Sequence, residues 1–181
     1  MDVVLRKLTE KDLETVRNWR NSDEVSKYMY TSEIITKEQQ INWFERIKND
    51  KGSIYWMIEY NGKSLGLVSV TNVDRVLNSC YWAFYLGDTS VRGVGIGGKV
   101  EYNVLKYVFE KLKLNKLRCE VFSFNEAVIR MHEKYGFRRE AYYREHCLKN
   151  GKYMDVVGLA MLKSEWFNLK NIIYDKVYKR N

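Results

Sequence analysis

The chain lacks several features that would narrow its class. It contains no proline among its 181 residues, an absence that says little about function. It has no apolar run of membrane length, and residues 1–6 show no signal-peptide pattern. We therefore expect a cytoplasmic protein that does not enter a membrane.

Cysteine is also scarce. The three cysteines are odd in number and widely spaced, at Cys80, Cys119 and Cys147. They form no spacing typical of a metal site, so we expect reduced thiols in the core and no bound metal.

No linker or repeat interrupts the sequence, and its 45% hydrophobic and 30% charged residues are ordinary for a globular protein. We expect one domain over residues 1–181. The formal net charge of +8 raises the question of nucleic-acid binding. Lysines such as Lys106, Lys111 and Lys116 are spread over expected helix faces, so we expect no nucleic-acid partner; a basic surface also suits small polyanionic ligands.

The most informative stretch is glycine-rich. It follows a strand-like run at 80–86 and precedes a helix-like run at 100–112. A strand, a glycine turn and a helix N-terminus together form an anion site, because backbone N–H groups of the first helical turn lack partners and the helix dipole favours negative charge. Glycine would let a phosphate approach this backbone. The candidate residues are Arg92, Gly93, Val94, Gly95, Ile96, Gly97, Gly98 and Lys99.

Other interpretations of this stretch fit less well. Gly93, Gly95 and Gly98 satisfy the dinucleotide fingerprint G-x-G-x-x-G, and Glu120 lies about where its ribose-binding acid would be. That fingerprint normally follows the first strand of a long βαβ series, whereas here half of the chain precedes it. A Walker loop is excluded because no Gly-Lys-Ser/Thr ends the run. The remaining alternative is an ordinary glycine-rich turn that binds no ligand.

A second element, at 125–137, decides between these interpretations. Asn125 is placed to cap a helix and to offer its amide to a ligand, and Gly136 is placed to end that helix before Phe137 begins a strand. This segment, together with Arg92-x-x-Gly95-x-Gly97, resembles the GCN5-related N-acetyltransferases, or GNAT family. The resemblance implies acetyl-CoA as cosubstrate.

The resemblance also implies the fold. We expect an α/β protein with a mixed, mostly antiparallel central sheet, whose fourth and fifth strands splay apart, flanked by helices. Local patterns agree with this order: strands are expected at 3–8, 53–60, 65–73, 80–86, 116–122, 137–146 and 153–163, and helices from Thr9, from Thr36, at 100–112 and at 126–135.

The N-terminal half carries the evidence on the acceptor. Trp19-Arg20-Asn21-Ser22, the segment 27–30 and Ser164-Glu165-Trp166 resemble the GNAT enzymes of pseudaminic acid synthesis. Those enzymes acetylate the 4-amino group of a UDP-linked 4-amino-4,6-dideoxy sugar used for flagellin or surface glycans. Acetyltransferases of ribosomal-protein N-termini and of spermidine share parts of these motifs, so they stay open as alternatives.

The resemblance assigns roles residue by residue. Arg20 would pair with phosphate, and the pocket for the nucleotide would contain Met29, Tyr30, Trp43 and Tyr85, although plain core packing is the alternative for each aromatic residue. A homodimer is one assembly open to such an enzyme.

For catalysis, the resemblance implies direct transfer. Backbone groups of Tyr85 and Leu86 would bind the cofactor, and Glu120 would be the base. His132 replaces the usual tyrosine as the acid for the departing thiolate. A relay through a cysteine lacks a nucleophile motif, and a non-catalytic CoA- or nucleotide-binding module is the remote alternative.

Overall fold

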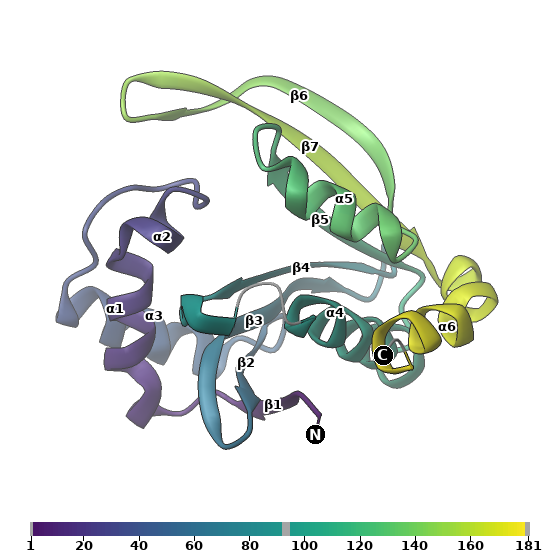
Figure 1. Ribbon diagram of the computed structural model, residues 1–181. Helices are drawn as coiled ribbons and strands as arrows, with labels where there is room; N and C mark the ends of the chain where they lie inside the picture. The colour runs from purple at the N-terminus through teal and green to yellow at the C-terminus, as the bar shows by residue number, and fades with distance from the viewer. Residues whose placement is uncertain (1, 92–94, 180–181) are drawn as a thin grey trace.

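The computed structural model describes residues 2–91 and 95–179, and these form seven strands in one sheet of order β1-β2-β3-β4-β5-β7-β6 (Figure 1). The strands are β1 (Val4–Lys7), β2 (Ile54–Tyr60), β3 (Lys63–Asp74), β4 (Ser79–Leu86), β5 (Lys116–Phe122), β6 (Arg138–Lys149) and β7 (Lys152–Leu162). All neighbouring strands are antiparallel except β4 and β5, which are parallel. The mixed, mostly antiparallel sheet expected from the sequence is confirmed.

Helices flank this sheet. The α-helices are α1 (Leu13–Asn21), α2 (Asp23–Ser26), α3 (Lys37–Asn49), α4 (Ile96–Lys106), α5 (Glu126–Lys134) and α6 (Lys163–Tyr178). Short 3₁₀ turns, Glu10–Asp12 and Thr89–Val91, precede α1 and α4, and a π-helical turn, Tyr107–Lys111, continues α4. No helix of the described ranges is long and apolar enough to cross a membrane.

Helix starts follow the expected capping chemistry. The side chain of Asp12 accepts a hydrogen bond from the backbone N–H of Thr9 at 2.8 Å, which forms a capping box before α1. The hydroxyl of Thr36 accepts one from the N–H of Gln39 at 3.2 Å at the start of α3. Both helix starts expected from the sequence are therefore confirmed.

Alternation along the strands produces two apolar layers. Met57 and Leu67 belong to a small cluster with Val16 of α1, whereas their neighbours Ile58 and Val68 belong to the large core that α4 covers. Successive side chains of a strand point to opposite faces, so both faces of the sheet are buried. Helix α1 and the glycine-rich helix α4 thus lie on opposite sides of the same strands.

The final helix was not expected. The last element expected from the sequence is the strand 153–163. The chain continues beyond it as α6, which packs on α4 and β7. Trp166 is fully buried, and its indole N–H donates to Glu110 Oε1 at 3.1 Å. Helix α6 therefore closes the core at the end of the molecule away from α2 (Figure 1).

Candidate active site

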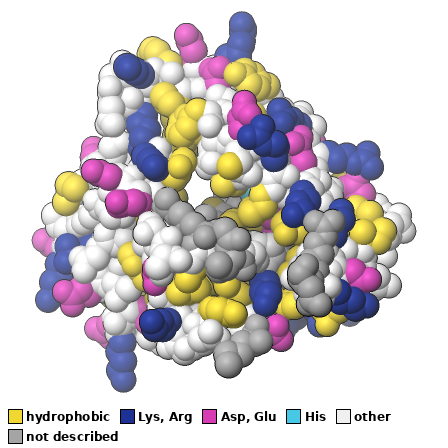
Figure 2. Space-filling view, in the orientation of Figure 1, with side chains coloured by type: hydrophobic (Ala, Val, Ile, Leu, Met, Phe, Trp, Pro, Cys, Tyr) yellow, Lys and Arg dark blue, Asp and Glu magenta, His cyan; other side chains and the backbone are white. Residues whose placement is uncertain are grey.

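The centre of the site is a fork between β4 and β5. The two strands pair only through Ser79–Tyr81 and Lys116–Arg118, and no ladder pair joins the rest of β4 to the rest of β5. Residues 82–86 and 119–122 therefore diverge from the fork, each with one open hydrogen-bonding edge. The space-filling view is hollowed near its centre, between the parts of the molecule that carry α4 and α5 (Figure 2).

Helix α4 points its N-terminus at this region. Gly95 has φ of +80°, in the left-handed region, and the helix begins at Ile96 rather than near Val100 as the sequence suggested. The first hydrogen bond of the helix runs from Lys99 N–H to Gly95 carbonyl O, at 3.4 Å. The N–H groups of the turn before it have no partner within the helix, so they can hold the diphosphate of CoA. Arg92, Gly93 and Val94 lie outside the described residues.

Gly97 and Gly98 of α4, both expected to contact the cofactor, also lie where α5 packs against α4. A Cβ at Gly98 would lie 2.2 Å from Tyr135 Oη, and one at Gly97 would lie 3.0 Å from Met131 Sδ. Gly98 therefore lets α5 pack closely against α4, a packing role that the sequence did not indicate. Lys99 lies against aromatic rings, its ammonium being 5.3 Å from the Tyr178 ring centre.

Tyr85 and Leu86 form one wall of the fork, opposite β5. The Tyr85 hydroxyl is buried, and burial raises its pKa while the nearby charge of Arg20 opposes that shift. The Tyr85 ring packs against the small cluster on the α1 side of the sheet. Tyr85 therefore lies on the face of the sheet that α1 covers, and the main chain at Leu86 pairs with Gly66 of β3 along the edge away from β5.

Glu120, on the opposite wall, contacts a residue of the N-terminal half. The Tyr30 hydroxyl donates a 2.6 Å hydrogen bond to Glu120 Oε2. Burial, and then this bond and the charge of Glu120, raise the pKa of Tyr30, so its hydroxyl keeps its proton at neutral pH. The Tyr30 ring packs edge-on against Phe122 at 5.4 Å. Two expected site residues therefore meet at the fork.

His132 lies at the inner end of the fork and is 3% exposed. Its Nδ1 is 3.1 Å from Oε2 of Glu101, which is fully buried. The ring packs edge-on against Trp82 of β4 at 5.3 Å and contacts Cys119 of β5, the first residues beyond the last ladder pair. Burial alone would lower the pKa of His132, but Glu101 and Cys119 outweigh it and raise that pKa to about 10.

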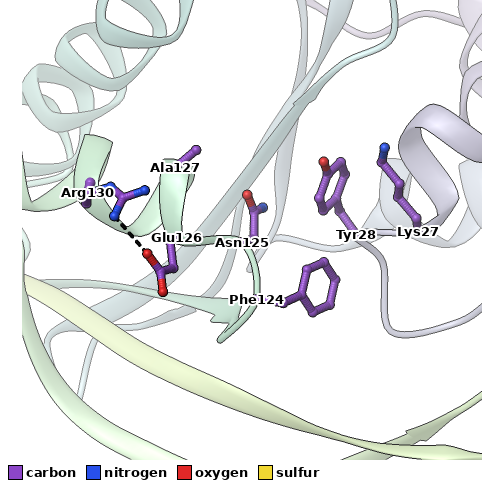
Figure 3. Close-up of a pocket in the computed structure, with 7 residues that line it drawn as sticks. All are labelled: Lys27, Tyr28, Phe124, Asn125, Glu126, Ala127 and Arg130. Carbon is purple, nitrogen blue, oxygen red and sulfur yellow. Dashed lines mark hydrogen bonds and ion pairs between the residues drawn. The ribbon is translucent and has the colours of Figure 1, made fainter.

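Asn125 occupies the N-cap position of α5, as expected, but its side chain makes no capping hydrogen bond. The carbonyl O of Asn125 accepts from the N–H of Val128 instead, at 3.1 Å. The side chain lines an open pocket of about 620 Å³ with Tyr28 and Phe124, whose rings stack at 6.1 Å (Figure 3). Lys27, Glu126, Ala127 and Arg130 complete that pocket. Asn125 is thus free to bond a ligand there.

Two cations near Tyr30 have no carboxylate partner within the described residues. Arg20 is half-buried, and its one hydrogen bond goes to the Thr31 hydroxyl at 3.4 Å. Within residues 2–91 and 95–179, neither Arg20 nor the half-buried Lys149 forms an ion pair with a carboxylate. Burial lowers the pKa of Arg20, and burial and the charge of Arg20 lower the pKa of Lys149.

Trp43 and Met29, two expected pocket residues, make different contacts. Trp43 packs edge-on against Tyr55 at 5.2 Å and joins the small cluster under α1 and α3, so its half-buried ring contributes to core packing. Met29 is half-buried beside Tyr30, and its carbonyl O accepts a 2.7 Å hydrogen bond from Lys149. The sequence analysis missed both Lys149 and Glu101, because no local pattern connects either residue to its partner.

All three cysteines are free. Cys80 and Cys119 are buried in the core, as expected, but Cys147 is only partly buried near the tip of the β6–β7 hairpin, so the expectation of a core thiol is wrong there. No group of three or more potential ligand side chains in the described chain could hold a metal ion.

Comparison with known proteins identifies the family. The model of the acetyltransferase (GNAT) domain matches residues 2–138, so the chain belongs to this family. It is an acetyl-CoA-dependent N-acetyltransferase, and the free first turn of α4 and the open edges of β4 and β5 fit that cosubstrate.

The matched relatives include acetyltransferases with different names. The acetyltransferase PseH of Campylobacter jejuni is 24% identical over 72% of this chain and 79% of its own. The spermidine N(1)-acetyltransferase of Vibrio cholerae is 23% identical over 92% of this chain and 96% of its own. A crystal structure of spermidine N-acetyltransferase from Vibrio cholerae with CoA and spermine has a TM-score of 0.87 at 22% identity, covering 92% of this chain and 99% of that one.

Proposed function

We propose that this enzyme acetylates the 4-amino group of a UDP-linked 4-amino-4,6-dideoxy sugar by direct transfer from acetyl-CoA. The observation that carries the choice of acceptor is the charge of Arg20, which lies near Tyr85 and Thr31 and has no carboxylate partner within the described residues. A half-buried guanidinium without a carboxylate partner is costly unless an anion binds to it. A nucleotide diphosphate is such an anion, and Arg20 can form paired hydrogen bonds with it.

A polyamine acceptor fits this charge less well. Spermidine is itself a polycation, so a site for it would need carboxylates where Arg20 lies. Glu120 accepts the hydrogen bond from Tyr30 at the fork, but we expect it to act as the base rather than to bind a cationic acceptor. The relationship to PseH supports the sugar, while the relationship to spermidine acetyltransferases supports the alternative. The charge of Arg20 is a further observation that supports the sugar.

The residues at the fork fit the proton transfers that such a reaction needs. The acceptor amine must lose a proton before its lone pair can attack, and we propose Glu120 as the base, directly or through one water. Tyr30 keeps its own proton, so its hydroxyl holds the Glu120 carboxylate toward the fork by donating to it. Backbone groups beside Tyr85 and Leu86 are proposed to bind the thioester carbonyl and the pantetheine. Acetyl-CoA supplies the activated acetyl group.

His132 is proposed to protonate the departing thiolate. It contacts Trp82 and Cys119 on both strands at the fork, and its raised pKa of about 10 keeps it protonated at neutral pH. Because only 3% of His132 is exposed, this role requires that the thiolate lie against the fork itself. His132→Gln should lower kcat more than it raises the KM for acetyl-CoA. Unchanged kcat across the pH range would remove His132 from the mechanism.

A relay through Cys119 is the rival chemistry, because this thiol contacts His132. It would leave an acetylated enzyme after incubation with acetyl-CoA alone. We expect no such mass increase, and we expect Cys119→Ala to retain activity. An added acetyl group on Cys119 that the acceptor removes would replace direct transfer by this relay.

The test of the proposed function is acetyl-CoA-dependent thiol release with three acceptors side by side. These are the UDP-4-amino-dideoxy sugar, a ribosomal-protein N-terminal peptide and spermidine. Turnover with the nucleotide sugar alone supports the proposal and a role in pseudaminic acid synthesis and flagellin glycosylation. Turnover with spermidine or the peptide alone keeps the acetyltransferase and replaces the acceptor. A cytoplasmic location and a homodimer belong to the same proposal, and light scattering tests the dimer.

A further inference from the structure

One side chain joins the tip of the β6–β7 hairpin to the segment after α2. Lys149 is the last residue of β6 and pairs with Lys152 across the turn. Its Nζ donates hydrogen bonds to the carbonyl oxygens of Ser26 and Met29, at 2.9 and 2.7 Å, and to Ser32 Oγ at 2.8 Å. In Figure 1 the hairpin arches across to α2, although the two segments are far apart in sequence.

These contacts use the full hydrogen-bonding capacity of the lysine. An ammonium has three donors, and each of the three has an oxygen partner here. The partners are neutral, so no carboxylate within the described chain balances the charge. Ser26 is the last residue of α2, and its carbonyl O, at the end of the helix where a cation is favourable, also accepts from the N–H of Met29 at 3.0 Å. Lys149 is therefore bound as a cap of α2 and has no donor left for a ligand.

The partners of Lys149 flank the residues that reach the active site. Met29 and Ser32 lie on either side of Tyr30 and Thr31 in the sequence. Tyr30 donates to Glu120, and Thr31 accepts from Arg20. Fixing the main chain at Met29 and the side chain of Ser32 therefore fixes the stretch that contacts the expected base and the expected phosphate ligand.

We propose that Lys149 is a positioning residue for the acceptor: it fastens the hairpin tip to the 26–32 segment and so holds Tyr30 and Thr31 against Glu120 and Arg20. This inference rests on the proposed function for its consequence on turnover, but the fastening itself does not depend on which acceptor is used. It also makes the hairpin tip one wall of the acceptor site.

The first experiment measures the fastening without any acceptor. Hydrogen exchange of the amides of residues 24–34 is compared in the wild type, Lys149→Met and the control Lys152→Met. The side chain of Lys152 is exposed and makes no hydrogen bond or ion pair within the described residues. We expect at least about tenfold faster exchange in this segment for Lys149→Met alone, with protection elsewhere unchanged. Equal exchange in all three proteins would overturn the proposal.

The second experiment measures the consequence, using whichever of the three acceptors the enzyme turns over. Lys149→Met should raise the acceptor KM about tenfold or more and leave the KM for acetyl-CoA within about twofold, since the cofactor contacts lie on other elements. Ser32→Ala, which removes one of the three bonds, should give a smaller rise. A loss shared equally by both substrates, or an acceptor KM unchanged despite faster exchange, would overturn the positioning role. Failure of the nucleotide sugar alone would instead overturn only the proposed function.

Discussion

The imidazole of His132 and the carboxylate of Glu101 face each other at 3.1 Å in a place that solvent does not reach. Glu101 is on α4 and His132 is on α5, so the pair joins the two helices that flank the fork. Burial raises the pKa of Glu101, and the charge of His132 opposes that shift. The pKa of His132 is raised to about 10, mainly because the charge of Glu101 outweighs the effect of burial. The folded protein therefore holds a proton here more tightly than the unfolded chain.

This pair gives stability a predictable dependence on pH. In the unfolded chain histidine loses its proton near pH 6.5. The contribution of the pair is therefore complete below about pH 6.5 and is lost as pH rises toward the folded pKa of about 10. We expect the free energy of unfolding to fall between those limits, by at most about 1.4 kcal/mol per pH unit for one proton. Urea unfolding at several pH values measures it.

The control for this prediction is the double variant Glu101→Gln, His132→Gln, which removes both titrating groups and keeps polar side chains of similar size. Other groups still titrate in it, so the difference between the two curves isolates the pair. A double variant whose stability fell as steeply as that of the wild type would show that other groups cause the dependence.

Glu120→Gln should reduce kcat by about 10²–10³, because the amide cannot accept the proton of the acceptor amine. The KM for acetyl-CoA should change little. Tyr30→Phe should reduce kcat less, by under about tenfold, since it removes only the bond that orients the carboxylate. Steady-state kinetics with the preferred acceptor measures both effects. Glu14→Gln, an exposed substitution on α1, is the control. Full activity of Glu120→Gln would rule out Glu120 as the base.

Arg20→Gln should weaken binding of the nucleotide part of the acceptor. We expect its KM to rise about tenfold or more, because a charge-assisted hydrogen bond contributes about 1.5–3 kcal/mol. UDP alone should inhibit the wild type competitively against the acceptor and should inhibit the variant much less. Arg17→Gln, one turn earlier on α1, is the matched control. Equal inhibition of wild type and Arg20→Gln by UDP would place the diphosphate elsewhere.

Gly98→Ala should destabilise the protein by about 1–3 kcal/mol, as is usual for an overpacked contact. The added methyl would lie 2.2 Å from Tyr135 Oη, so α4 and α5 would have to separate. Thermal unfolding measures the loss. Combining it with Tyr135→Leu, which removes the facing ring, should recover part of it relative to Tyr135→Leu alone. Simple additivity of the two substitutions would contradict the contact as the cause.

Much of the chain could be predicted from short-range signals. The hairpin turn Asn61–Gly62 has φ of +52° and +74°, the conformation that an Asn-Gly pair favours. By contrast, the start of α4 was placed too late, because Gly97 and Gly98 are poor helix formers and only the packing of α5 explains their helical conformation. Helix α6 was missed although Trp166 and Ile173 have helical spacing, since the expected topology ended one element earlier.

The site was harder to predict than the fold. The glycine turn and the segment from Asn125 could be found because each combines a local backbone signal with a motif. The hydrogen bond from Tyr30 to Glu120 joins residues 90 positions apart, and only the folded chain brings them together. The packing of Trp43 against Tyr55 could not be predicted from its type, because an aromatic residue suits both a pocket and a core.

The three-pair seam between β4 and β5 gives the middle of the sheet an unusual property. Beyond the seam each strand has a bare edge, and bare edges of exposed strands are the sites at which other chains add and aggregation begins. Here the two bare edges are turned toward one another inside a single sheet, so a foreign strand would have to enter lengthwise rather than approach from the side. The molecule thus keeps two backbone edges ready for a narrow extended ligand while shielding them from other proteins.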